Sequence, residues 1–245
     1  MVKPSALAVV TGAARRVGRL FALALARRGY SIVLHYHTSR SVIDQTVQEI
    51  AALGCPVYPV QADLTTEQGL NTLIQGIDEA LESSDACLKV LVNSAAVMPR
   101  ASLTELALSD WDATLALNLR APFYLTQAAA QRMSTGGLVV NVTDVGARKI
   151  WVNYPAYVVS KSALETLTRL QARTYAPTVR VNALAFGFVL PSEAMSAAEW
   201  NSLLNRTPLG RAVAPEELSL ALEFLLDTPS ITGQTLVLDS GYSLI

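Results

Sequence analysis

The chain has 245 residues, of which 51% are hydrophobic and 16% are charged, and its formal net charge is −1. This balance suits a large buried core and excludes the strong positive charge of proteins that bind nucleic acids or anionic membranes. No Pro/Gly-rich linker divides the sequence, so we interpret residues 1–245 as a single α/β domain.

The sequence contains no recognisable targeting signal or metal-binding motif. Its start does not resemble a signal peptide, and no uncharged apolar run approaches ~20 residues. Cys55 and Cys87 lack the spacing of metal ligands, and we interpret them as reduced thiols. We therefore expect a cytoplasmic protein with a small-molecule substrate, no metal, and neither a membrane nor a nucleic acid as partner.

Short apolar runs alternate with longer segments of helical periodicity along the chain. The predicted strands are 7–11, 31–36, 57–60, 88–92, 138–142, 179–184 and 235–238. The predicted helices are 16–28, 42–53, 65–81, 109–133 with an interruption at Pro122, 156–175 and 215–226. Strands that alternate with helices predict a parallel sheet covered on both faces. Residues 191–209 are the least regular, and we interpret them as a candidate substrate flap.

The first strand and the first helix are joined by a glycine-spaced turn at residues 11–18. Free backbone N–H groups and the helix dipole at such a turn favour an anion such as a phosphate. Gly12 permits the sharp turn, and Gly18 permits close packing of helix on strand. The turn therefore indicates dinucleotide binding rather than a plain loop.

The end of the second strand indicates which dinucleotide is bound. An NAD site has an acid here for the ribose hydroxyls, but the first carboxylate in this stretch is Asp44. Imidazole, hydroxyl and guanidinium groups suit a 2′-phosphate, and Arg15 or Arg16 can add a second charge from the first turn. The alternative is a polar loop with a solvated arginine. The predicted NADP(H) contacts here are His37, Thr38, Ser39 and Arg40.

Asp63 follows the third predicted strand and has two interpretations. A carboxylate at the end of this strand can accept a hydrogen bond from the adenine amine. It can equally cap the helix that starts near Thr65. The sequence does not decide between them.

A proton donor is indicated by Tyr157 and Lys161. The two residues are four apart in a predicted helix, so their side chains share one face. An ammonium beside a phenol stabilises the phenolate, and we expect it to lower the pKa of Tyr157. Asp144 lies thirteen residues before the tyrosine. We expect it to orient the substrate and assist protonation, the alternative being a turn former before Gly146.

In combination, these segments resemble the short-chain dehydrogenase/reductase family over essentially the whole chain. The matching motifs are residues 11–18, Ala62-Asp63-Leu64, Asn93-Ser94-Ala95, Asn118, Tyr157-x3-Lys161, Arg180-Val181-Asn182 and Ile231-Thr232-Gly233-Gln234. The resemblance implies a doubly wound Rossmann fold with strand order 3-2-1-4-5-6-7 and hydride transfer with a nicotinamide cofactor. It also implies a homodimer or homotetramer whose interfaces use the helices carrying Asn118 and Tyr157.

The resemblance carries over site roles residue by residue. Asn118 is expected to position a water that links Lys161 to solvent, the alternative being a helix residue that satisfies a neighbour's backbone. Lys161 is expected to hold the ribose, and Tyr157 to donate the proton. The remaining expected cofactor contacts are Gly12, Val17, Gly18, Asp63, Leu64, Asn93, Ala95 and Gly187.

The departures from the family pattern point to one branch. Arg16 replaces the third glycine of the turn, Asp144 replaces the usual serine, and Phe186-Gly187 replaces Pro-Gly. The first two changes resemble the pteridine reductases and the dihydromonapterin/dihydrofolate reductases. Reduction of a pterin needs a proton at a ring nitrogen, and a carboxylate can both relay it and accept from the ring amide and amino groups.

The substrate-facing residues leave this assignment open. Pteridine reductases have an aromatic residue where this chain has Val97-Met98, and Met98 can pack against a flat ring instead. Trp151 and Tyr154 either supply aromatic surface or pack within their loop. We therefore expect an NADPH-dependent reductase acting on a C=N or C=O of a pterin-like substrate. The alternatives are a reductase of another carbonyl compound, such as a 3-oxoacyl thioester, a sugar or a xenobiotic ketone, and a non-catalytic NADP(H) sensor.

Overall fold

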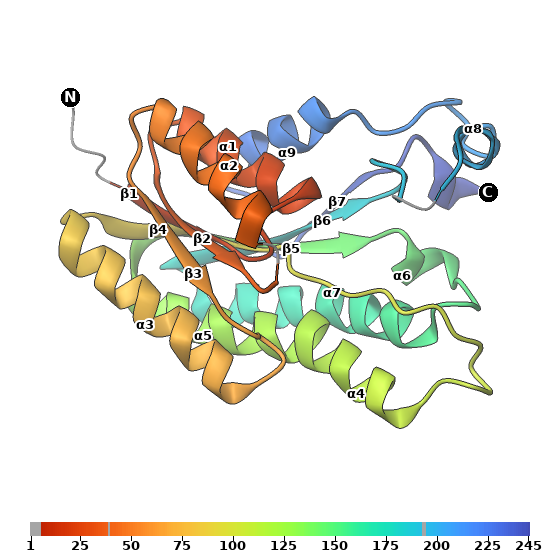
Figure 1. Cartoon of the computed structure of the whole chain (residues 1–245), viewed down its shortest axis with the longest axis horizontal. Coiled ribbons are helices and arrows are strands. Elements are labelled where there is room, and N and C mark those ends of the chain that lie inside the picture. Colours follow the sequence, from red (N-terminus) through yellow and green to blue (C-terminus); the bar gives the residue numbers. More distant parts are fainter. Residues whose placement is uncertain (1–5, 39, 193–194) are drawn as a thin grey trace.

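A computed structural model describes residues 6–38, 40–192 and 195–245, and for residues 40 and 41 it describes the backbone alone. Seven parallel strands form one sheet in the order β3-β2-β1-β4-β5-β6-β7 (Figure 1). This order confirms the predicted doubly wound Rossmann fold. The strands are β1 (Ala6–Val10), β2 (Ser31–Tyr36), β3 (Val57–Gln61), β4 (Cys87–Asn93), β5 (Met133–Asp144), β6 (Val179–Phe186) and β7 (Thr235–Leu238).

Helices cover both faces of the sheet. In Figure 1, α1, α2 and α9 lie above it, whereas α3, α4, α5 and α7 lie below it. Among the described residues, no helix has the length and apolar character needed to cross a membrane. The helices are α1 (Arg16–Arg27), α2 (Arg40–Ala52), α3 (Glu67–Ser84), α4 (Leu108–Leu115), the π-helical turn η1 (Ala116–Arg120), α5 (Ala121–Arg132), α6 (Gly146–Lys149), α7 (Pro155–Tyr175), α8 (Ala197–Leu204), α9 (Pro215–Asp227) and the 3₁₀ turn η2 (Tyr242–Leu244).

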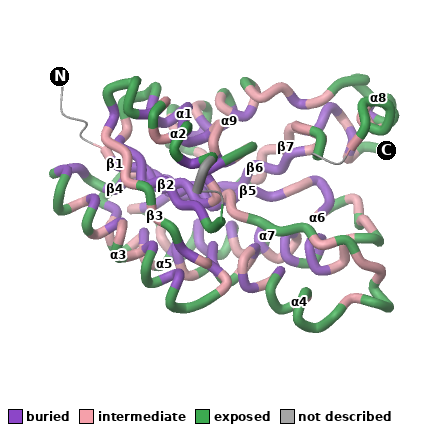
Figure 2. Tube along the Cα trace, in the orientation of Figure 1, coloured by how far each residue is buried: buried purple, intermediate pink, exposed green. Residues whose placement is uncertain are grey.

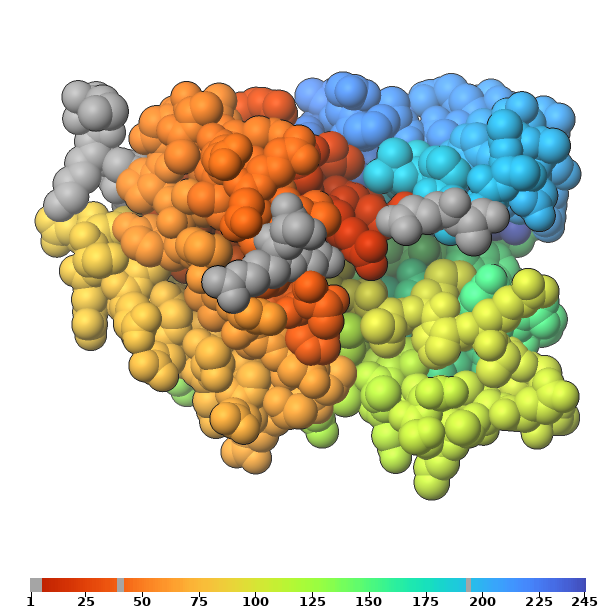
Figure 3. All heavy atoms as spheres, in the orientation of Figure 1, coloured from red at the N-terminus to blue at the C-terminus, as the bar shows by residue number. Residues whose placement is uncertain are grey.

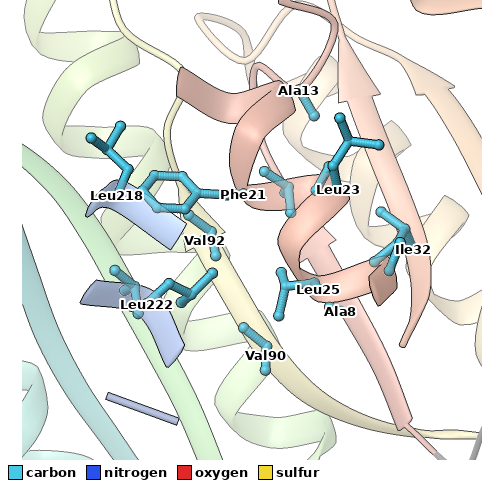
Figure 4. Packing of buried hydrophobic residues seen from close by; sticks show 14 of the residues in the cluster. Ala8, Ala13, Phe21, Leu23, Leu25, Ile32, Val90, Val92, Leu218 and Leu222 are labelled. Atoms are coloured by element: carbon cyan, nitrogen blue, oxygen red, sulfur yellow. The ribbon is translucent and has the colours of Figure 1, made fainter. Parts of the chain in front are cut away.

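The sheet separates two apolar layers, and its central strands are buried along their length (Figure 2). In the upper layer, Phe21 of α1 packs beside Leu218 and Leu222 of α9 over β4 (Figure 4). The lower layer joins α3 and α5 to the opposite face through residues such as Leu73 and Leu125. Burying each such side chain contributes roughly 1.5–3 kcal/mol, so these two layers hold the strand ends in fixed positions.

The carboxyl ends of the strands form one edge where the site lies. β1 pairs with β2 on one side and β4 on the other, so the chain leaves the central strands in opposite directions. A crevice forms at such a switch point. In Figure 3, red atoms from the start of the chain lie between the cyan segment around α8 and the yellow-green loop after β4.

The predicted helix 109–133 is divided into α4, η1 and α5. Pro122 has no N–H to donate to the carbonyl of Asn118 four residues earlier, and its ring crowds that carbonyl. The chain widens into the π-helical turn, where the N–H of Ala121 bonds the carbonyl of Ala116. The predicted interruption at Pro122 therefore begins one turn earlier than the proline itself.

Three short elements were not expected from periodicity: α6, α8 and η2. The helix α8 lies inside the segment 191–209 that we interpreted as a flap. A Ser-x-x-Glu capping box starts it, in which Ser196 and Glu199 each bond the other's backbone N–H. That signal is present in the sequence. Whether the segment moves stays a prediction.

The last strand crossing depends on Arg180. Its guanidinium donates to the carbonyls of Leu225, Thr228 and Ile231 at 2.7–3.3 Å. The neighbouring Asn182 bonds the backbone of Ile231 and Gln234. The two side chains therefore provide hydrogen-bond partners for the backbone between α9 and β7.

Changing Arg180 to Met should lower the free energy of unfolding by about 2–4 kcal/mol, because several partly buried carbonyls lose their donor. Urea unfolding followed by circular dichroism measures this loss. Arg173→Met, at an exposed arginine of α7, is the control and should change stability by less than about 0.5 kcal/mol. Equal stability of the two variants would contradict the role given to Arg180.

Candidate active site

A cavity of about 1120 Å³ lies at the carboxyl edge of the sheet. It is bordered by the ends of β1, β2, β5 and β6, the loop after β4 and the C-terminal turn. Such a volume exceeds that of a typical small-ligand pocket. The predicted site residues that line it are Gly12, Arg15, Arg16, Val17, Gly18, His37, Thr38, Asp63, Leu64, Ala95, Met98, Asp144, Tyr157, Lys161 and Gly187.

Two predicted site residues within the described part of the chain, Asn93 and Asn118, do not line the cavity. Asn93 is buried behind it, where its amide donates to Asn141 and Thr126. Asn118 is also fully buried. Ser39 and the side chain of Arg40 lie outside the described residues.

The first turn has the shape that a phosphate cradle requires. Gly12 has a φ of +65°, and a Cβ there would lie 2.9 Å from the Cα of Ala95. A Cβ on Gly18 would lie 2.3 Å from the carbonyl oxygen of Gly12. Neither position accepts a larger residue, so the backbone of the turn stays open to the cavity. Thr11 ties this turn to β4 by accepting from the N–H groups of Ser94 and Ala95.

His35 holds the turn from behind, a role that the sequence analysis did not assign. Its Nδ1 lies 3.1 Å from the N–H of Gly12, and its Nε2 lies 3.0 Å from the carbonyl of Ala62. Nδ1 must accept and Nε2–H must donate, so the ring is neutral. Burial lowers the pKa of His35 to about 4, consistent with that tautomer. The signal for this role is a histidine inside an otherwise apolar buried strand.

The end of β3 brings a carboxylate to the same edge. Asp63 Oδ1 accepts from the N–H and the hydroxyl of Thr65 at 3.0 and 2.7 Å, and these bonds hold its pKa below the usual range. Thr66, not Asp63, is the N-cap of α3. The capping interpretation is therefore wrong in detail, because Asp63 closes the turn before the helix. Its Oδ2 makes no hydrogen bond with the described residues, and the adenine contact stays a prediction.

Tyr157 and Asp144 meet at the centre of the cavity. The hydroxyl of Tyr157 donates to Asp144 Oδ2 at 3.0 Å, and Asp144 Oδ1 accepts from the N–H of Gly146 at 2.7 Å. Asp144 ends β5, whereas Tyr157 lies in the first turn of α7. Asp144 therefore both forms the turn and contacts the phenol, so its two interpretations are not exclusive.

Burial shifts the pKa of both groups upward. It raises the pKa of Asp144 to about 6, and the bonds from Gly146 and Tyr157 oppose that rise. It also raises the pKa of Tyr157 well above 10, and the Asp144 carboxylate adds to the rise. The expected lowering of the phenol pKa by Lys161 is wrong for this arrangement, because a carboxylate rather than an ammonium faces the hydroxyl.

Lys161 lies one helical turn after the tyrosine and points beneath its ring. Its ammonium donates to the carbonyl of Val142 at 2.8 Å and lies 5.6 Å from the centre of the Tyr157 ring. Burial lowers the pKa of Lys161 to about 8. The cation is therefore present at neutral pH and is held by β5 and α7 together.

Asn118 holds the loop after β4 in place. Its side-chain oxygen accepts from the N–H of Val97, and its amide donates to the carbonyl of Val97 and the hydroxyl of Ser160. This is the backbone-satisfying alternative considered for its side chain. Its carbonyl lacks an α-helical donor because Pro122 has no N–H. A water link from Asn118 to Lys161 would therefore use that carbonyl and stays a prediction.

With this geometry established, known proteins can be compared. The family model described as enoyl-(acyl carrier protein) reductase matches residues 12–243. A 3-oxoacyl-[acyl-carrier-protein] reductase from Synechocystis is 33% identical over 243 residues, covering 96% of this chain and 96% of that protein. The chain belongs to the short-chain dehydrogenase/reductase family. The resemblance inferred from the motifs is thereby confirmed.

Two solved members of the short-chain family have the same fold over nearly their whole length. FolM alternative dihydrofolate reductase 1 from Brucella canis, complexed with NADP, has a TM-score of 0.90 and 30% identity, covering 100% of this chain and 96% of that chain. The angucycline C-6 ketoreductase LanV with bound NADP has a TM-score of 0.93 and 28% identity, covering 99% and 97%. These relatives act on different kinds of compound.

Arg16 explains one departure from the family pattern. Its φ is +53°, a region where glycine is favoured, which is why the family has a glycine here. The guanidinium of Arg16 donates to the carbonyls of Leu190 and Pro191 at 3.0 and 2.9 Å. These bonds offset the backbone strain and join the first turn to the segment after β6. Arg15 also lines the cavity.

Aromatic residues line the part of the cavity next to Tyr157. Trp151 and Tyr154 both face it and contact one another edge to face, with ring centres 6.3 Å apart. They therefore pack within their loop and supply aromatic surface. Met98 lies at the cavity with 41% of its surface exposed. No three His, Cys, Asp or Glu side chains gather as a metal site among the described residues.

Changing Asp144 to Asn should stabilise the protein at about pH 8 and not at about pH 4. The raised pKa means that the native state binds a proton more tightly than the unfolded state. The free energy of unfolding therefore falls as the pH rises from about 4 to about 6 and stays low above that, and an amide avoids this loss. We expect a gain of about 1–2 kcal/mol, because Asp144 faces the cavity and is partly screened.

Urea unfolding at both pH values measures this gain. Asp44→Asn, at an exposed carboxylate of α2, is the control and should show no pH-dependent difference. Loss of stability in Asp144→Asn at the higher pH would contradict the unfavourable burial of this carboxylate.

Proposed function

We propose that the protein reduces the C=N or C=O group of a pterin-like substrate with NADPH. It is an NADP(H)-dependent reductase of the short-chain family. The observation that carries the proposal is the hydrogen bond between the Tyr157 hydroxyl and the Asp144 carboxylate inside the cavity. A proton donor paired with a carboxylate suits a substrate that must gain a proton on nitrogen.

The residues of the cavity fit a phosphorylated dinucleotide. The open backbone at Gly12 and Gly18 would hold the pyrophosphate at the start of α1. His37 and Thr38 line the end nearest β2, where the 2′-phosphate would lie with Ser39 and Arg40. No carboxylate ends β2, so nothing there selects ribose hydroxyls over a phosphate. When bound, NADPH supplies the hydride.

Tyr157 and Asp144 have different roles in protonation of the substrate. Tyr157 gives its proton to the reacting nitrogen or oxygen of the substrate. Ionised Asp144 opposes formation of a phenolate beside it, whereas protonated Asp144 can return a proton to the tyrosine through the 3.0 Å bond. With a pKa of about 6, both forms of Asp144 are accessible near neutral pH. Lys161, whose ammonium donates to the carbonyl of Val142, would hold the ribose of the cofactor.

Asp144 also favours a nitrogen heterocycle as substrate. Its carboxylate can accept from ring N–H and amino groups, which the hydroxyl of the usual family serine does less well. The similarity to a Brucella alternative dihydrofolate reductase supports the same class. Trp151 and Tyr154 offer aromatic surface where Val97 and Met98 do not.

A second candidate is a reductase of a different carbonyl compound. The absence of an aromatic residue at Val97-Met98 favours it, because a pterin would lose its stacking partner there. The similarities to a 3-oxoacyl-carrier-protein reductase and to a polycyclic ketoreductase support this alternative. The third interpretation, a non-catalytic sensor, does not account for a proton donor, a lysine and a carboxylate grouped in one cavity.

We further propose that the active form is a homodimer or homotetramer. Leu119 and Phe123 lie beside Leu167 of α7 in an open hollow on the outer surface, and Phe123 is 45% exposed. Exposed apolar groups on these helices favour contact with a second copy. The helices involved are those that carry Asn118 and Tyr157.

Changing Tyr157 to Phe should lower kcat/KM by about 10³-fold or more, since only the proton donor is lost. NADPH binding, measured by fluorescence titration, should stay within about threefold, because the ring is retained. Tyr175→Phe in the same helix is the control, as that hydroxyl makes no hydrogen bond with the described residues. Retained turnover in Tyr157→Phe would refute the proton-donor role.

A panel assay of cofactor oxidation tests the substrate and the dinucleotide together. We expect NADPH to exceed NADH by about tenfold or more in kcat/KM, because a charged 2′-phosphate pairs with cations near the end of β2. Dihydropterins and dihydrofolate should be turned over faster than simple ketones or 3-oxoacyl thioesters. A preference for NADH would overturn the 2′-phosphate site, and faster ketone reduction would favour the second candidate.

A further inference from the structure

One wall of the cavity is formed by segments from the C-terminal part of the chain. The segment after β6, the helix α8 and the C-terminal turn η2 build it, and these elements lie together at one end of the molecule (Figure 1). Its side chains facing the cavity include Phe188, Leu190, Trp200, Leu203, Arg206 and Tyr242.

Three aromatic rings of this wall, those of Phe188, Trp200 and Tyr242, pack together and are called the aromatic floor below. The rings of Phe188 and Tyr242 have centres 4.7 Å apart, and the rings of Phe188 and Trp200 have centres 6.1 Å apart and cross at 78°. Tyr242 is buried. Contiguous aromatic packing of this kind presents a rigid apolar surface to a ligand.

The helix α8 directs a regular set of side chains at the cavity. Trp200 and Leu203 are three residues apart and share one face of α8. The Ser196–Glu199 capping box fixes where this helix begins. Arg206 is an exposed residue of the turn that follows α8, and it borders the same cavity.

Arg206 is a cation without an acidic partner among the described residues. Its guanidinium lies 5.8 Å from the centre of the Tyr242 ring, and it forms no hydrogen bond or ion pair with the described residues. Among the described residues, the carboxylates lining the cavity are Asp63 and Asp144, which bond Thr65 and Tyr157 respectively. Lys149, on the same ring at 4.4 Å, instead donates to the carbonyl of Tyr242.

We propose that Arg206 binds an anionic group of the substrate, at the end remote from the bond that is reduced. The aromatic floor would carry a flat apolar body, and the guanidinium would take a carboxylate or phosphate by paired N–H donors. The inference deepens the proposed function, on which it rests, by naming the substrate class: a flat unsaturated compound with an acidic arm. The acid could be a carboxylate or the phosphate of a thioester carrier.

The test compares acidic and neutral ligands that share one reacting group. Isothermal titration into protein saturated with NADP⁺ gives the dissociation constants of folate and pterin, which differ by the acidic arm. Steady-state kinetics give KM for acetoacetyl-coenzyme A against ethyl acetoacetate, which has the same ketone but lacks the phosphate-bearing carrier. In Arg206→Gln, we expect the preference for the acidic member to fall about tenfold in one of these pairs. The pair affected identifies the acid.

Matched variants separate charge from folding. Arg206→Lys should keep part of the preference, because an ammonium retains the charge but not the paired donors. Arg173→Gln, on the exposed surface of α7, should leave both preferences unchanged, and thermal unfolding should confirm that each variant is folded. An unchanged preference in both pairs for folded Arg206→Gln would overturn the inference.

Failure of the proposed function would be visible separately. If no carbonyl or C=N compound is reduced in a Tyr157-dependent manner, the proposed reaction fails. The binding arm with folate and pterin would still report on Arg206, since it needs no turnover. Loss of acid preference there would support a carboxylate site. Titration with acetoacetyl-coenzyme A and ethyl acetoacetate, which also needs no turnover, covers the phosphate, and an unchanged preference in both pairs would refute the inference.

Discussion

The hydrogen bond between Tyr157 and Asp144 is the interaction on which the proposed chemistry of this protein depends. It joins the end of β5 to the first turn of α7, so the position of the phenol in the cavity is set by both elements. Both groups are largely removed from water, and their pKa values rise as a result. The rest of the fold supplies the stability that holds this unfavourable pair in place.

Much of the architecture was predictable because the sequence is locally consistent. Buried strands read as short Val- and Leu-rich runs, and Ser31–Tyr36 and Thr235–Leu238 were found with their observed bounds. Parallel strands end at one edge, which explains why motifs far apart in the chain meet there. The region from 109 to 133 was read as one helix with a break because periodicity does not distinguish a π-helical turn from an α-helix.

The sequence could not predict in which direction the side chains of the site point or which groups they contact. The spacing of Tyr157 and Lys161 placed them on one helix face, but it did not reveal that the carboxylate of Asp144 would face the phenol. The role of Arg16 was predicted from its charge, whereas its hydrogen bonds go to the carbonyls of Leu190 and Pro191. A histidine within an apolar strand signals a buried polar role for His35, but the sequence does not name the two backbone groups that it bonds. Such contacts depend on distances between segments that no spacing rule encodes.

His35 has a consequence for how the protein responds to acidity. A neutral imidazole anchors the first turn, and with a pKa of about 4 it keeps that state across the whole physiological range. Asp144 and Lys161, by contrast, change charge near 6 and 8 at the other end. The charge of the first turn is therefore independent of pH in this range, whereas the charge around Tyr157 changes with pH.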